Sequence, residues 1–469
     1  MEKDPRKLSI SSTRVVFLLI LSFLFLDFFC GNIIPFDQWI QYYETTFTSR
    51  GISNDTVQQE HESLKFLLSR VVTGEDRKKL QVTGFACHTT KDSAHCVTNC
   101  RSIWVEFLCV NTNQPVRINT RTMTVHIASH QPVQETVVRP YARQEDHNLL
   151  KNVTPVKILQ IYITMPPACQ YIHGVPAVIF SSSGFVGNFF HEFNEIIIPL
   201  FITTSHLRSR VQFILEDYKA SFVRKYSKPM SQLSAYEVIN PVADTSVHCF
   251  PGAIIGLKFQ GHLALNSSDT PGGYSFQDFK QFLRQTYNLK FAHVSEIRRP
   301  NLVLVSRRKT RRFLNEDEMV STMEELGFRV IIVARNNVLS NLNKLARIIN
   351  SCRVFVGAHG AGLTNELFLP AGAVMVQVDL IGLEWPAKAY YGDPARAMDV
   401  HYLPYRIEPE ESSLLKVFGR NHTVFKDPKS FSSEVGREIY LNNQNVRINL
   451  ARFRETMVEA LSIVEDTDV

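Results

Sequence analysis

Short apolar runs alternate with longer amphipathic segments along the later part of the chain. Four runs predict buried strands: LVLVSR (302–307), RVIIVA (329–334), RVFVGA (353–358) and VMVQV (374–378). The segments between them carry apolar residues at helical spacing, and Asn315 followed by Glu318 resembles the capping pair that starts a helix. Strands joined by crossover helices predict a parallel, doubly wound sheet.

The same alternation appears earlier, between Tyr171 and Lys258. Residues 176–180 and 211–215 predict buried strands, and residues 188–207 between them predict one helix. Short, partly alternating runs precede this region and indicate a β-rich lead-in, while a polar region at 272–279 separates the two halves. We therefore expect an α/β fold with two Rossmann-like domains facing a cleft.

The amino-terminal pattern differs, because Val15 to Ile34 is apolar over about the length that crosses a bilayer. Basic residues precede it, which by the positive-inside bias predicts a cytosolic tail and a lumenal body. A cleaved signal peptide is the alternative. The expected organisation is a tail (1–14), a transmembrane signal anchor (15–34), a stem (35–80), an α/β domain with the lead-in (81–290), a second Rossmann-like domain (291–435) and a helical segment (436–469).

Composition agrees with a large protein of the secretory pathway. The 469 residues are 44% hydrophobic, which is enough for a sizeable core. Fifty-one basic residues against 45 acidic ones leave a charge of only +6, which gives little support to nucleic-acid binding. Four sequons are expected to carry N-glycans: Asn54, Asn152, Asn266 and Asn421.

The cysteines fit an oxidising compartment. Four of them crowd into one short region where disulfides are favoured, although their pairing stays open: Cys87, Cys96, Cys100 and Cys109. Irregular spacing without a paired CxxC motif disfavours a zinc site. Cys169, Cys249 and Cys352 lie elsewhere and make the lumenal total odd, so we expect at least one free thiol.

The segment from Ser351 to Leu380 holds the strongest indication of a ligand site. It predicts a buried strand, a glycine-rich turn with one histidine, a helix at 363–369 and a second strand. Three glycines would let the backbone approach a ligand: Gly357, Gly360 and Gly362. Free amides at the helix start favour phosphate, so a nucleotide diphosphate is the expected ligand. Alternatively, these glycines serve packing alone.

Cationic side chains follow the predicted strands. Because open α/β sheets bind ligands at the carboxyl ends of their strands, we expect Arg307, His359 and the residues after Val378 to converge. Arg307 can offer a fork of donors to phosphate oxygens, and Arg308, Arg311 and Arg312 are further cations. A solvated basic loop is the alternative.

Other residues would complete the ligand contacts. His359 could donate to the diphosphate or a sugar, and Gly360 and Ala361 offer backbone amides. Thr364 either contacts phosphate or caps the helix. Glu384 is placed to accept hydrogen bonds from ribose hydroxyls, with a solvated loop glutamate as the alternative.

A second polar cluster is predicted on the helix at 188–207. Asn188, His191 and Glu195 are spaced i, i+3 and i+7, which puts them on one face. If that face looks into the cleft, either His191 or Glu195 could act as a general base, and the sequence does not separate them. The alternative is a buried His–Glu pair that only positions the helix.

Four blocks resemble the signatures of glycosyltransferase family 61. They are FSSSGFVGNFFHEFNEIIIPLF (180–201), LVLVSRRKTRRFLNEDE (302–318), GAHGAGLTNELFLPAGAVMVQV (357–378) and GLEWPAKAYYGDPARAM (382–398). The resemblance runs from about Tyr171 to the end and implies a GT-B fold, inversion at the anomeric carbon, a nucleotide-sugar donor and a Golgi or endoplasmic reticulum location.

The run from Gly382 to Leu414 is similar to the plant branch that decorates xylan, which includes grass arabinofuranosyl and xylosyl transferases. One departure is local: Gln114 to Arg117 stands where plant members usually show a GDVR-like element. More distant relatives add xylose to N-glycans or N-acetylglucosamine to protein O-glycans.

The resemblance therefore implies a Golgi type II inverting enzyme that transfers a pentose, arabinofuranose or xylose, from a UDP-sugar onto xylan in the plant cell wall. The expected partners are a UDP-pentose, a xylan or xylo-oligosaccharide acceptor and the membrane, but not nucleic acid. In this scheme 81–290 is the acceptor side and 291–435 binds the donor.

Two alternatives remain: an N-glycan or protein O-glycan glycosyltransferase of the same fold, and a non-catalytic glycan-binding subunit of a Golgi synthase complex. A soluble dehydrogenase is disfavoured by the glycine spacing of GAHGAG. The one Asp-x-Asp element, Asp466 and Asp468, lies at a terminus that is expected to fray. Because cationic side chains can neutralise the leaving diphosphate, we expect that no metal is required.

Overall fold

The computed structural model describes residues 96–466 apart from the short segments 103–104, 113–114, 130–133, 145, 163–166 and 334–340. The described residues all belong to one compact unit, Lys79–Val469. The expected tail, anchor and stem lie outside the described residues. Among the helices that are described, none combines the length and apolar character needed to cross a membrane.

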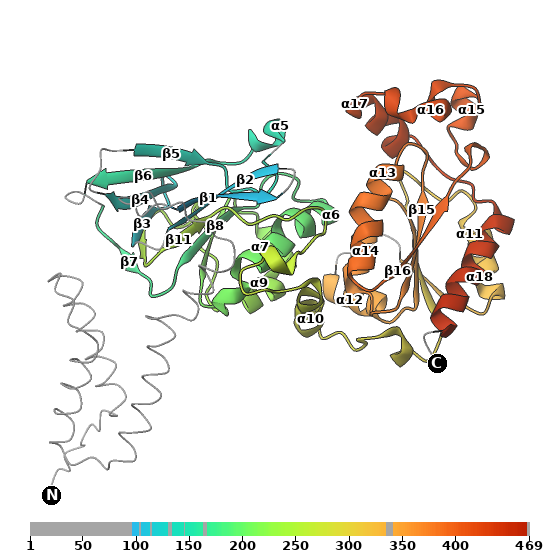
Figure 1. The fold of residues 1–469 in the computed structure, drawn as a ribbon, viewed down its shortest axis with the longest axis horizontal. Helices are drawn as coiled ribbons and strands as arrows, with labels where there is room; N and C mark the ends of the chain where they lie inside the picture. Colours follow the sequence, from blue (N-terminus) through green and yellow to red (C-terminus); the bar gives the residue numbers. More distant parts are fainter. Residues whose placement is uncertain are drawn as a thin grey trace, which may run out of the picture. The chain divides into compact units, whose positions relative to one another are not determined.

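The later half is built on a five-stranded parallel sheet with strand order β13-β12-β14-β15-β16 (Figure 1). Its strands are β12 (Asn301–Val305), β13 (Arg329–Val333), β14 (Val354–Ala358), β15 (Val374–Asp379) and β16 (His401–Arg406). The first four confirm the predicted strands and the doubly wound arrangement. β16 was not predicted, because HYLPYR contains Pro404, which tolerates only an edge position; β16 is an edge strand, paired with β15 alone.

Helices cover both faces of this sheet (Figure 1). Alternate residues of each strand enter different cores: Leu302 and Leu304 pack in the cluster of α11 and α18, whereas Val303 and Val305 pack in the cluster of α12. The covering elements are α11 (Glu316–Glu325), α12 (Leu342–Asn350), the 3-10 helix η5 (Ala361–Phe368), α13 (Glu384–Ala387), η6 (Lys388–Gly392), α14 (Asp393–Ala397) and α18 (Leu450–Asp466).

The start of α11 agrees with the prediction, but its cause differs. Asn315 is the N-cap residue and its side chain makes no capping hydrogen bond. Instead, its amide donates to the Ile448 carbonyl at 2.9 Å and accepts from the Ile448 amide at 2.9 Å. Asn315 therefore fastens the segment before α18 to the start of α11.

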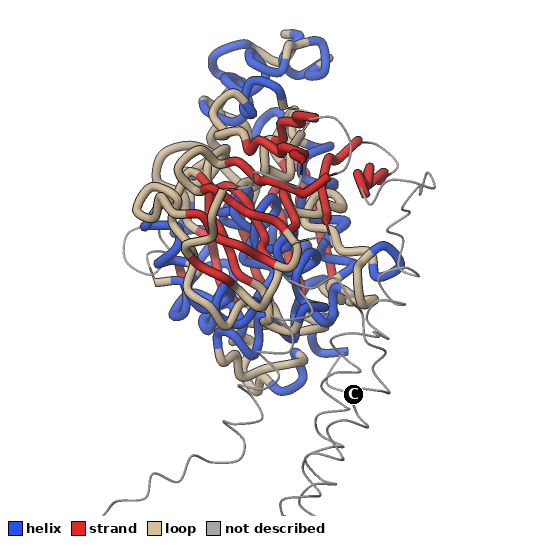
Figure 2. The backbone as a smooth tube through the Cα atoms, turned by 90° about the vertical axis from the view of Figure 1, so that its left-hand side faces the viewer, coloured by secondary structure: helices blue, strands red, loops and turns tan. Residues whose placement is uncertain are grey.

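The earlier half contains two mixed sheets, whose strands are drawn in red in Figure 2. One has the order β1-β2-β11-β8-β9, and the other β5-β6-β4-β3-β10-β7. In the first, β11, β8 and β9 run parallel while β1 and β2 are antiparallel. The expected β-rich lead-in and the strands at 176–180 and 211–215 are confirmed, but this half is a mixed α/β region rather than a simple Rossmann-like sheet.

The strands of this half are β1 (Cys96–Ser102), β2 (Val105–Thr112), β3 (Val116–Asn119), β4 (Thr124–Ser129), β5 (Gln134–Val138), β6 (Val156–Tyr162), β7 (Tyr171–Ile172), β8 (Ala177–Ser181), β9 (Gln212–Glu216), β10 (Val247–Phe250) and β11 (Ala253–Ile255). A disulfide joins Cys169 to Cys249, and Cys352 is a buried free thiol, as the odd count predicted.

The predicted helix at 188–207 is continuous but not uniform. It comprises α6 (Phe189–Glu192), the π-helical segment η1 (Phe193–Ile197), α7 (Ile198–Thr204) and η2 (Ser205–Leu207). Pro199 has no amide hydrogen to donate to the Glu195 carbonyl, and the wider i to i+5 turn precedes it, with the Ile198 amide bonded to the Phe193 carbonyl.

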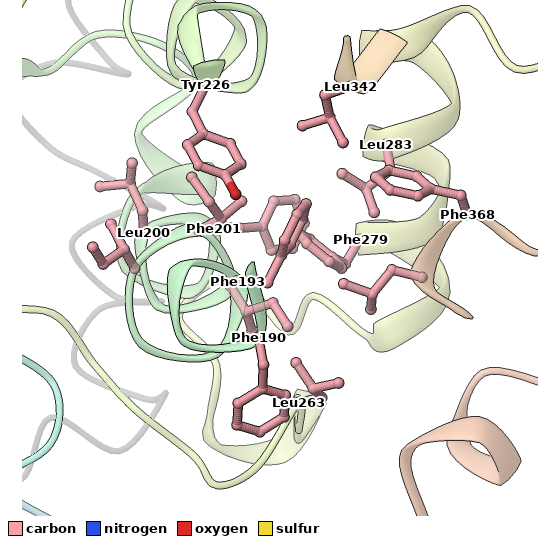
Figure 3. Packing of buried hydrophobic residues seen from close by; sticks show 14 of the residues in the cluster. Phe190, Phe193, Leu200, Phe201, Tyr226, Leu263, Phe279, Leu283, Leu342 and Phe368 are labelled. Carbon is pink, nitrogen blue, oxygen red and sulfur yellow. The ribbon is translucent and has the colours of Figure 1, made fainter. Parts of the chain in front are cut away.

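One hydrophobic core extends from this helix to Val303, Phe355 and Met375 of the parallel sheet. Figure 3 shows the part of this core around Phe193, Phe279 and Phe368. Phe193 of η1 meets Phe368 of η5 with ring centroids 5.9 Å apart, and Tyr287 meets Phe368 at 5.4 Å. Tyr287 ends α10 (Phe276–Tyr287), which begins inside the region expected to be a polar separator. Ser275 and Asp278 form a capping box there, and the buried face of α10 joins the same core.

Short helices complete the described part. They are α5 (His147–Leu150), α8 (Ala220–Lys225), α9 (Ser227–Leu233), η3 (Ser267–Asp269), η4 (Val294–Glu296), η7 (Pro409–Glu411), α15 (Leu415–Phe418), α16 (Thr423–Lys426), η8 (Pro428–Ser430), α17 (Ser433–Gly436) and η9 (Arg437–Asn442).

Candidate active site

The parallel sheet has its topological switch point between β12 and β14. Numbered along the chain, its strands follow the order 2-1-3-4-5. The chain thus passes from β12 to β13 at one edge, and from β14 through β15 to β16 at the other edge. Ligands of such sheets bind at the carboxyl ends of the strands at this point. Arg307 follows β12 and His359 follows β14, so the fold brings these two predicted residues to the switch point.

Two guanidinium groups meet at Gly360. A Cβ atom added to Gly360 would lie 2.7 Å from Nη1 of both Arg307 and Arg311. Arg311 donates to the His359 carbonyl at 3.0 Å, and Arg307 Nε donates to the Thr310 carbonyl at 2.9 Å. Burial and the neighbouring Arg307 lower the pKa of Arg311 to about 10, which leaves it charged at neutral pH. Two adjacent cations suit a polyanionic ligand.

His359 is a neutral hydrogen-bond donor in this setting. Its side chain is buried, and its Nδ1 lies 3.2 Å from Gln377 Nε2, which as a donor leaves the ring proton on Nε2. Burial, Arg311 and Arg307 lower the pKa of His359 to about 3. Because the ring stays neutral, its Nε2–H can donate to an oxygen without adding a third charge.

The three glycines of the turn have different roles. Gly360 has φ +142°, and its missing side chain lets the guanidinium groups of Arg307 and Arg311 come close to the backbone. Gly357 and Gly362 face the core instead: added Cβ atoms would lie 2.9 Å from Leu363 and 2.9 Å from Val305, respectively. These contacts support the packing alternative for Gly357 and Gly362.

The helix after the turn is also different from the expectation. It is the 3-10 helix η5, and its N-cap residue is Gly360 rather than Thr364. Thr364 is fully buried beside the Tyr391 phenol, while Ala361 occupies the first position of η5. The predicted capping role of Thr364 is therefore wrong. Ala361 lies at the start of the helix, the position from which its amide was predicted to contact the ligand.

His191 and Glu195 form one buried polar cluster. His191 Nδ1 lies 2.7 Å from Glu195 Oε1, and Arg143 Nη1 lies 3.5 Å from the same oxygen. The Tyr141 hydroxyl donates to the other oxygen, Oε2. Glu195 is fully buried, whereas the His191 side chain remains 17% exposed. Both carboxylate oxygens are thus occupied, and His191 is the member of the pair with access to solvent.

Asn188 is not part of this helix face. It is the N-cap residue of α6, with extended backbone, and its side chain accepts from the Phe190 amide at 3.1 Å. The i, i+3, i+7 prediction therefore holds for the His191–Glu195 contact but is wrong for Asn188, because the helix begins one residue later.

Two aromatic residues connect the His191 cluster with the arginine cluster. Tyr391 lies 5.5 Å from the His359 ring and 5.7 Å from the Phe190 ring, measured between centroids. Phe190 directly precedes His191, and α6 packs on η5. The carboxyl edge of the parallel sheet and the polar face of α6 are therefore neighbours.

Glu384 begins α13, shortly after the end of β15. It is exposed, and its Oε1 accepts from the Gly382 amide at 3.1 Å. Asp379, the last residue of β15, is buried and accepts from the Tyr402 hydroxyl at 3.4 Å. Burial raises the pKa of Asp379 to about 7. Carboxyl groups with such shifted pKa values are common at functional sites.

Several buried polar atoms near the switch point lack protein partners. Among the described residues, these include Ser306 Oγ, Arg311 Nε and Gln377 Oε1. Buried polar atoms nearly always find a partner, so this edge suits a polar ligand. Within the same residues, no group of three or more metal-binding side chains is found.

Tyr141 and Tyr391 were not predicted as site residues, Arg311 was predicted only as a further cation, and Asp379 was included only among the residues after Val378. Tyr141 carries no local signal, since it lies 54 residues from its partner Glu195. Asp379, however, could have been singled out as the acidic residue that directly follows the predicted strand at 374–378. Among the sequons, Asn152, Asn266 and Asn421 are exposed, and Asn54 lies outside the described residues.

A surface cavity of about 340 Å³ lies along α12. It is lined by Asn341, Asn343, Lys344, Arg347, Ile348 and Ser351. None of the predicted site residues lines this cavity.

Comparisons with known proteins agree with the resemblance. A family model described as Glycosyltransferase 61 matches residues 187–376, a range that includes His191, Glu195, Arg307, Arg311 and His359. The chain is 39% identical over 333 residues to an alpha-1,3-arabinosyltransferase from Oryza sativa subsp. japonica, covering 69% of this chain and 57% of the relative. It is 37% identical over 363 residues to a beta-1,2-xylosyltransferase from the same plant, covering 74% and 63%.

A third relative is a xylan glycosyltransferase from Arabidopsis thaliana. The identity is 33% over 356 residues, covering 71% of this chain and 72% of the relative. The chain matches 57% and 63% of the length of the two rice proteins, so it spans about three fifths of them.

Proposed function

The chain belongs to glycosyltransferase family 61, and from this premise we propose that it transfers a pentose, arabinofuranose or xylose, from a UDP-sugar onto xylan. The names of its relatives include arabinosyl, xylosyl and xylan glycosyltransferases, which supports a pentose donor and a xylan acceptor. The proposal extends to a GT-B arrangement and to a type II protein of the Golgi membrane.

The observation that carries the proposal is the cationic pair at the switch point. Arg307 and Arg311 converge on Gly360, and His359 presents a neutral N–H beside them. As the bond between the anomeric carbon and the diphosphate breaks, its electron pair passes to a phosphate oxygen. The two guanidinium groups and the imidazole N–H stabilise that charge, which a preorganised site does more effectively than water.

The geometry favours His191 over Glu195 as the general base. Glu195 is enclosed and its oxygens are engaged by Tyr141, Arg143 and His191. It can orient the imidazole and stabilise its protonated form, as the carboxylate of a catalytic triad does. His191 Nε2 would then take the proton of the acceptor hydroxyl while the hydroxyl oxygen attacks the anomeric carbon from the side opposite UDP, giving inversion.

A donor and acceptor panel tests the activity. Full-length protein in detergent is incubated with UDP-arabinofuranose, UDP-xylose or UDP-N-acetylglucosamine and with xylohexaose, an N-glycopeptide or an O-mannosyl peptide. We expect a pentose to reach xylohexaose only, with an inverted linkage by NMR. The absence of transfer to xylohexaose from every donor would refute the xylan assignment.

A paired substitution tests the donor site. Arg307→Ala should weaken UDP binding by at least about tenfold, because a charge-assisted hydrogen bond is removed. Arg308 is the matched control, since it is the next residue, carries the same charge and is exposed. Equal UDP affinity of Arg307→Ala and Arg308→Ala would place the diphosphate elsewhere.

A further inference from the structure

Trp385 exposes a large aromatic surface beside the candidate active site. It is 63% exposed, although the indole is among the costliest groups to leave in water. It lies in α13, which follows the carboxyl end of β15 after a short loop. Isolated exposed apolar residues are ordinary, so its surroundings decide whether it has a role.

Two further rings support Trp385. Tyr390 meets it edge to face, with centroids 5.7 Å apart at 73°, and His262 does so at 6.3 Å and 88°. Tyr390 and His262 contact each other at 4.5 Å. We call these three residues the aromatic shelf. Because its neighbours meet the indole at steep angles, Trp385 is held in place while much of its surface stays open.

The shelf is continuous with the residues proposed to perform the reaction. Tyr390 stacks on Phe190 at 5.0 Å and 28°, and Phe190 contacts His191 at 5.3 Å. Burial, together with the charges of Arg143 and His191, lowers the pKa of His262 to about 4. A neutral His262 adds no charge to the shelf. The shelf is thus aromatic, uncharged and next to the proposed base.

A β-1,4-linked xylose ring is chemically complementary to such a surface. It carries no charge and no hydroxymethyl group, so both faces of the ring present C–H groups. These bear a small positive charge and are attracted to the negative face of an aromatic ring. The diphosphate of the donor, in contrast, needs the cations at Gly360. Donor and acceptor would therefore use separate, neighbouring surfaces.

We propose that Trp385, supported by Tyr390 and His262, forms an acceptor subsite that stacks on a xylosyl residue of the xylan chain near the one that is modified. This inference rests on the proposed function and adds the residues that select the acceptor. It also explains how an enzyme can distinguish a chain from a single sugar, because a second xylose ring gains the stacking contact while the first receives the pentose.

Steady-state kinetics on full-length protein test the subsite. Trp385→Ala should raise the KM for xylohexaose by about tenfold, the effect of removing about 1.4 kcal/mol of contact, with kcat and the KM for the UDP-sugar little changed. Trp385→Phe should give an intermediate KM because it keeps a ring. Tyr236→Ala is the control, since Tyr236 is another exposed aromatic residue, 44% exposed, on a loop of the earlier half.

Tryptophan fluorescence gives an independent readout. The chain has only three tryptophans, so the contribution of Trp385 to the emission is measurable. Xylohexaose should change the emission of the parent protein and change that of Trp385→Phe much less. UDP should change the emission of both proteins to the same extent. An unchanged acceptor KM in Trp385→Ala, with transfer to xylan intact, overturns the subsite and leaves the proposed function standing. Absence of any transfer to xylan by the parent protein refutes the proposed function and, with it, the xylose occupant.

Discussion

Replacing Gly360 with alanine tests the cationic site most directly. Gly360 has φ +142° and ψ 174°, a region that is almost restricted to glycine and costs other residues about 1–3 kcal/mol. The added methyl group would also lie 2.7 Å from Nη1 of Arg307 and of Arg311, closer than van der Waals contact. Both guanidinium groups must then move away from the place where the diphosphate is expected.

The expected change in UDP affinity follows from the hydrogen bonds that a displaced arginine can no longer donate to the diphosphate. One charge-assisted hydrogen bond contributes about 1.5–3 kcal/mol, so displacement of one arginine should raise the Kd for UDP about 10- to 100-fold. Isothermal titration with UDP measures this change, and circular dichroism confirms that the variant is folded. The variant should also unfold at a lower temperature than the parent protein because of the backbone strain.

Gly419→Ala is the matched control. Gly419 has φ +73° and ψ 153°, and nothing lies within 4 Å of an added Cβ. It should therefore show a comparable decrease in thermal stability without any change in UDP affinity. If Gly360→Ala binds UDP as tightly as Gly419→Ala, the arginine pair does not hold the diphosphate, and the reasoning fails.

Three further results are expected. His191→Ala should lower kcat by about 10²- to 10⁴-fold while UDP binding is retained, and a kcat within twofold of the parent value would exclude it as the base. The pKa of Asp379 is raised to about 7 in the folded protein, so the folded state binds a proton that the unfolded state has released between about pH 4 and pH 7, and the free energy of unfolding falls as pH rises through that range. Thermal unfolding should show the parent protein losing up to about 4 kcal/mol of stability relative to Asp379→Asn between these pH values. Parallel pH profiles of the two proteins would contradict this. Excess EDTA should leave pentose transfer unchanged, whereas a loss of transfer that Mn²⁺ reverses would show that cationic side chains alone do not suffice.

Much of the architecture could be predicted from apolar runs. The inner strands β12, β14 and β15 are buried on both faces, so each appears as a run of mostly apolar residues. The edge strand β13 is partly exposed but keeps the apolar run VIIV, and β12 to β15 were therefore all placed correctly. β16 was not predicted, because Pro404 interrupts its apolar pattern, which an edge strand tolerates. α10 was not predicted, because two glycines shortly before its first turn made this region resemble a linker.

The site was predictable where chemistry and strand order coincide. Arg307 and His359 could be paired because strand ends share an edge, whereas the position of Arg311 depends on the path of a loop with a left-handed residue at Arg311 itself. Tyr141 could not be found, since its contact with Glu195 depends on how distant segments fold together. Gly357 and Gly362, whose added Cβ atoms would meet the core, could not be assigned from sequence, because a glycine needed for packing and one needed for ligand approach look alike there.

The hydrophobic cluster that contains both Phe193 and Phe368 has a consequence for engineering. The proposed base lies on α6 in the earlier half, and the proposed diphosphate site lies in loops after β12 and β14 of the later half. The elements beside them, η1 and η5, are nevertheless packed into the same core. Chimeras that join the earlier half of one relative to the later half of another would mismatch side chains at this seam. Exchanging acceptor preference between relatives should therefore succeed more often by grafting surface residues around α13 than by swapping whole halves.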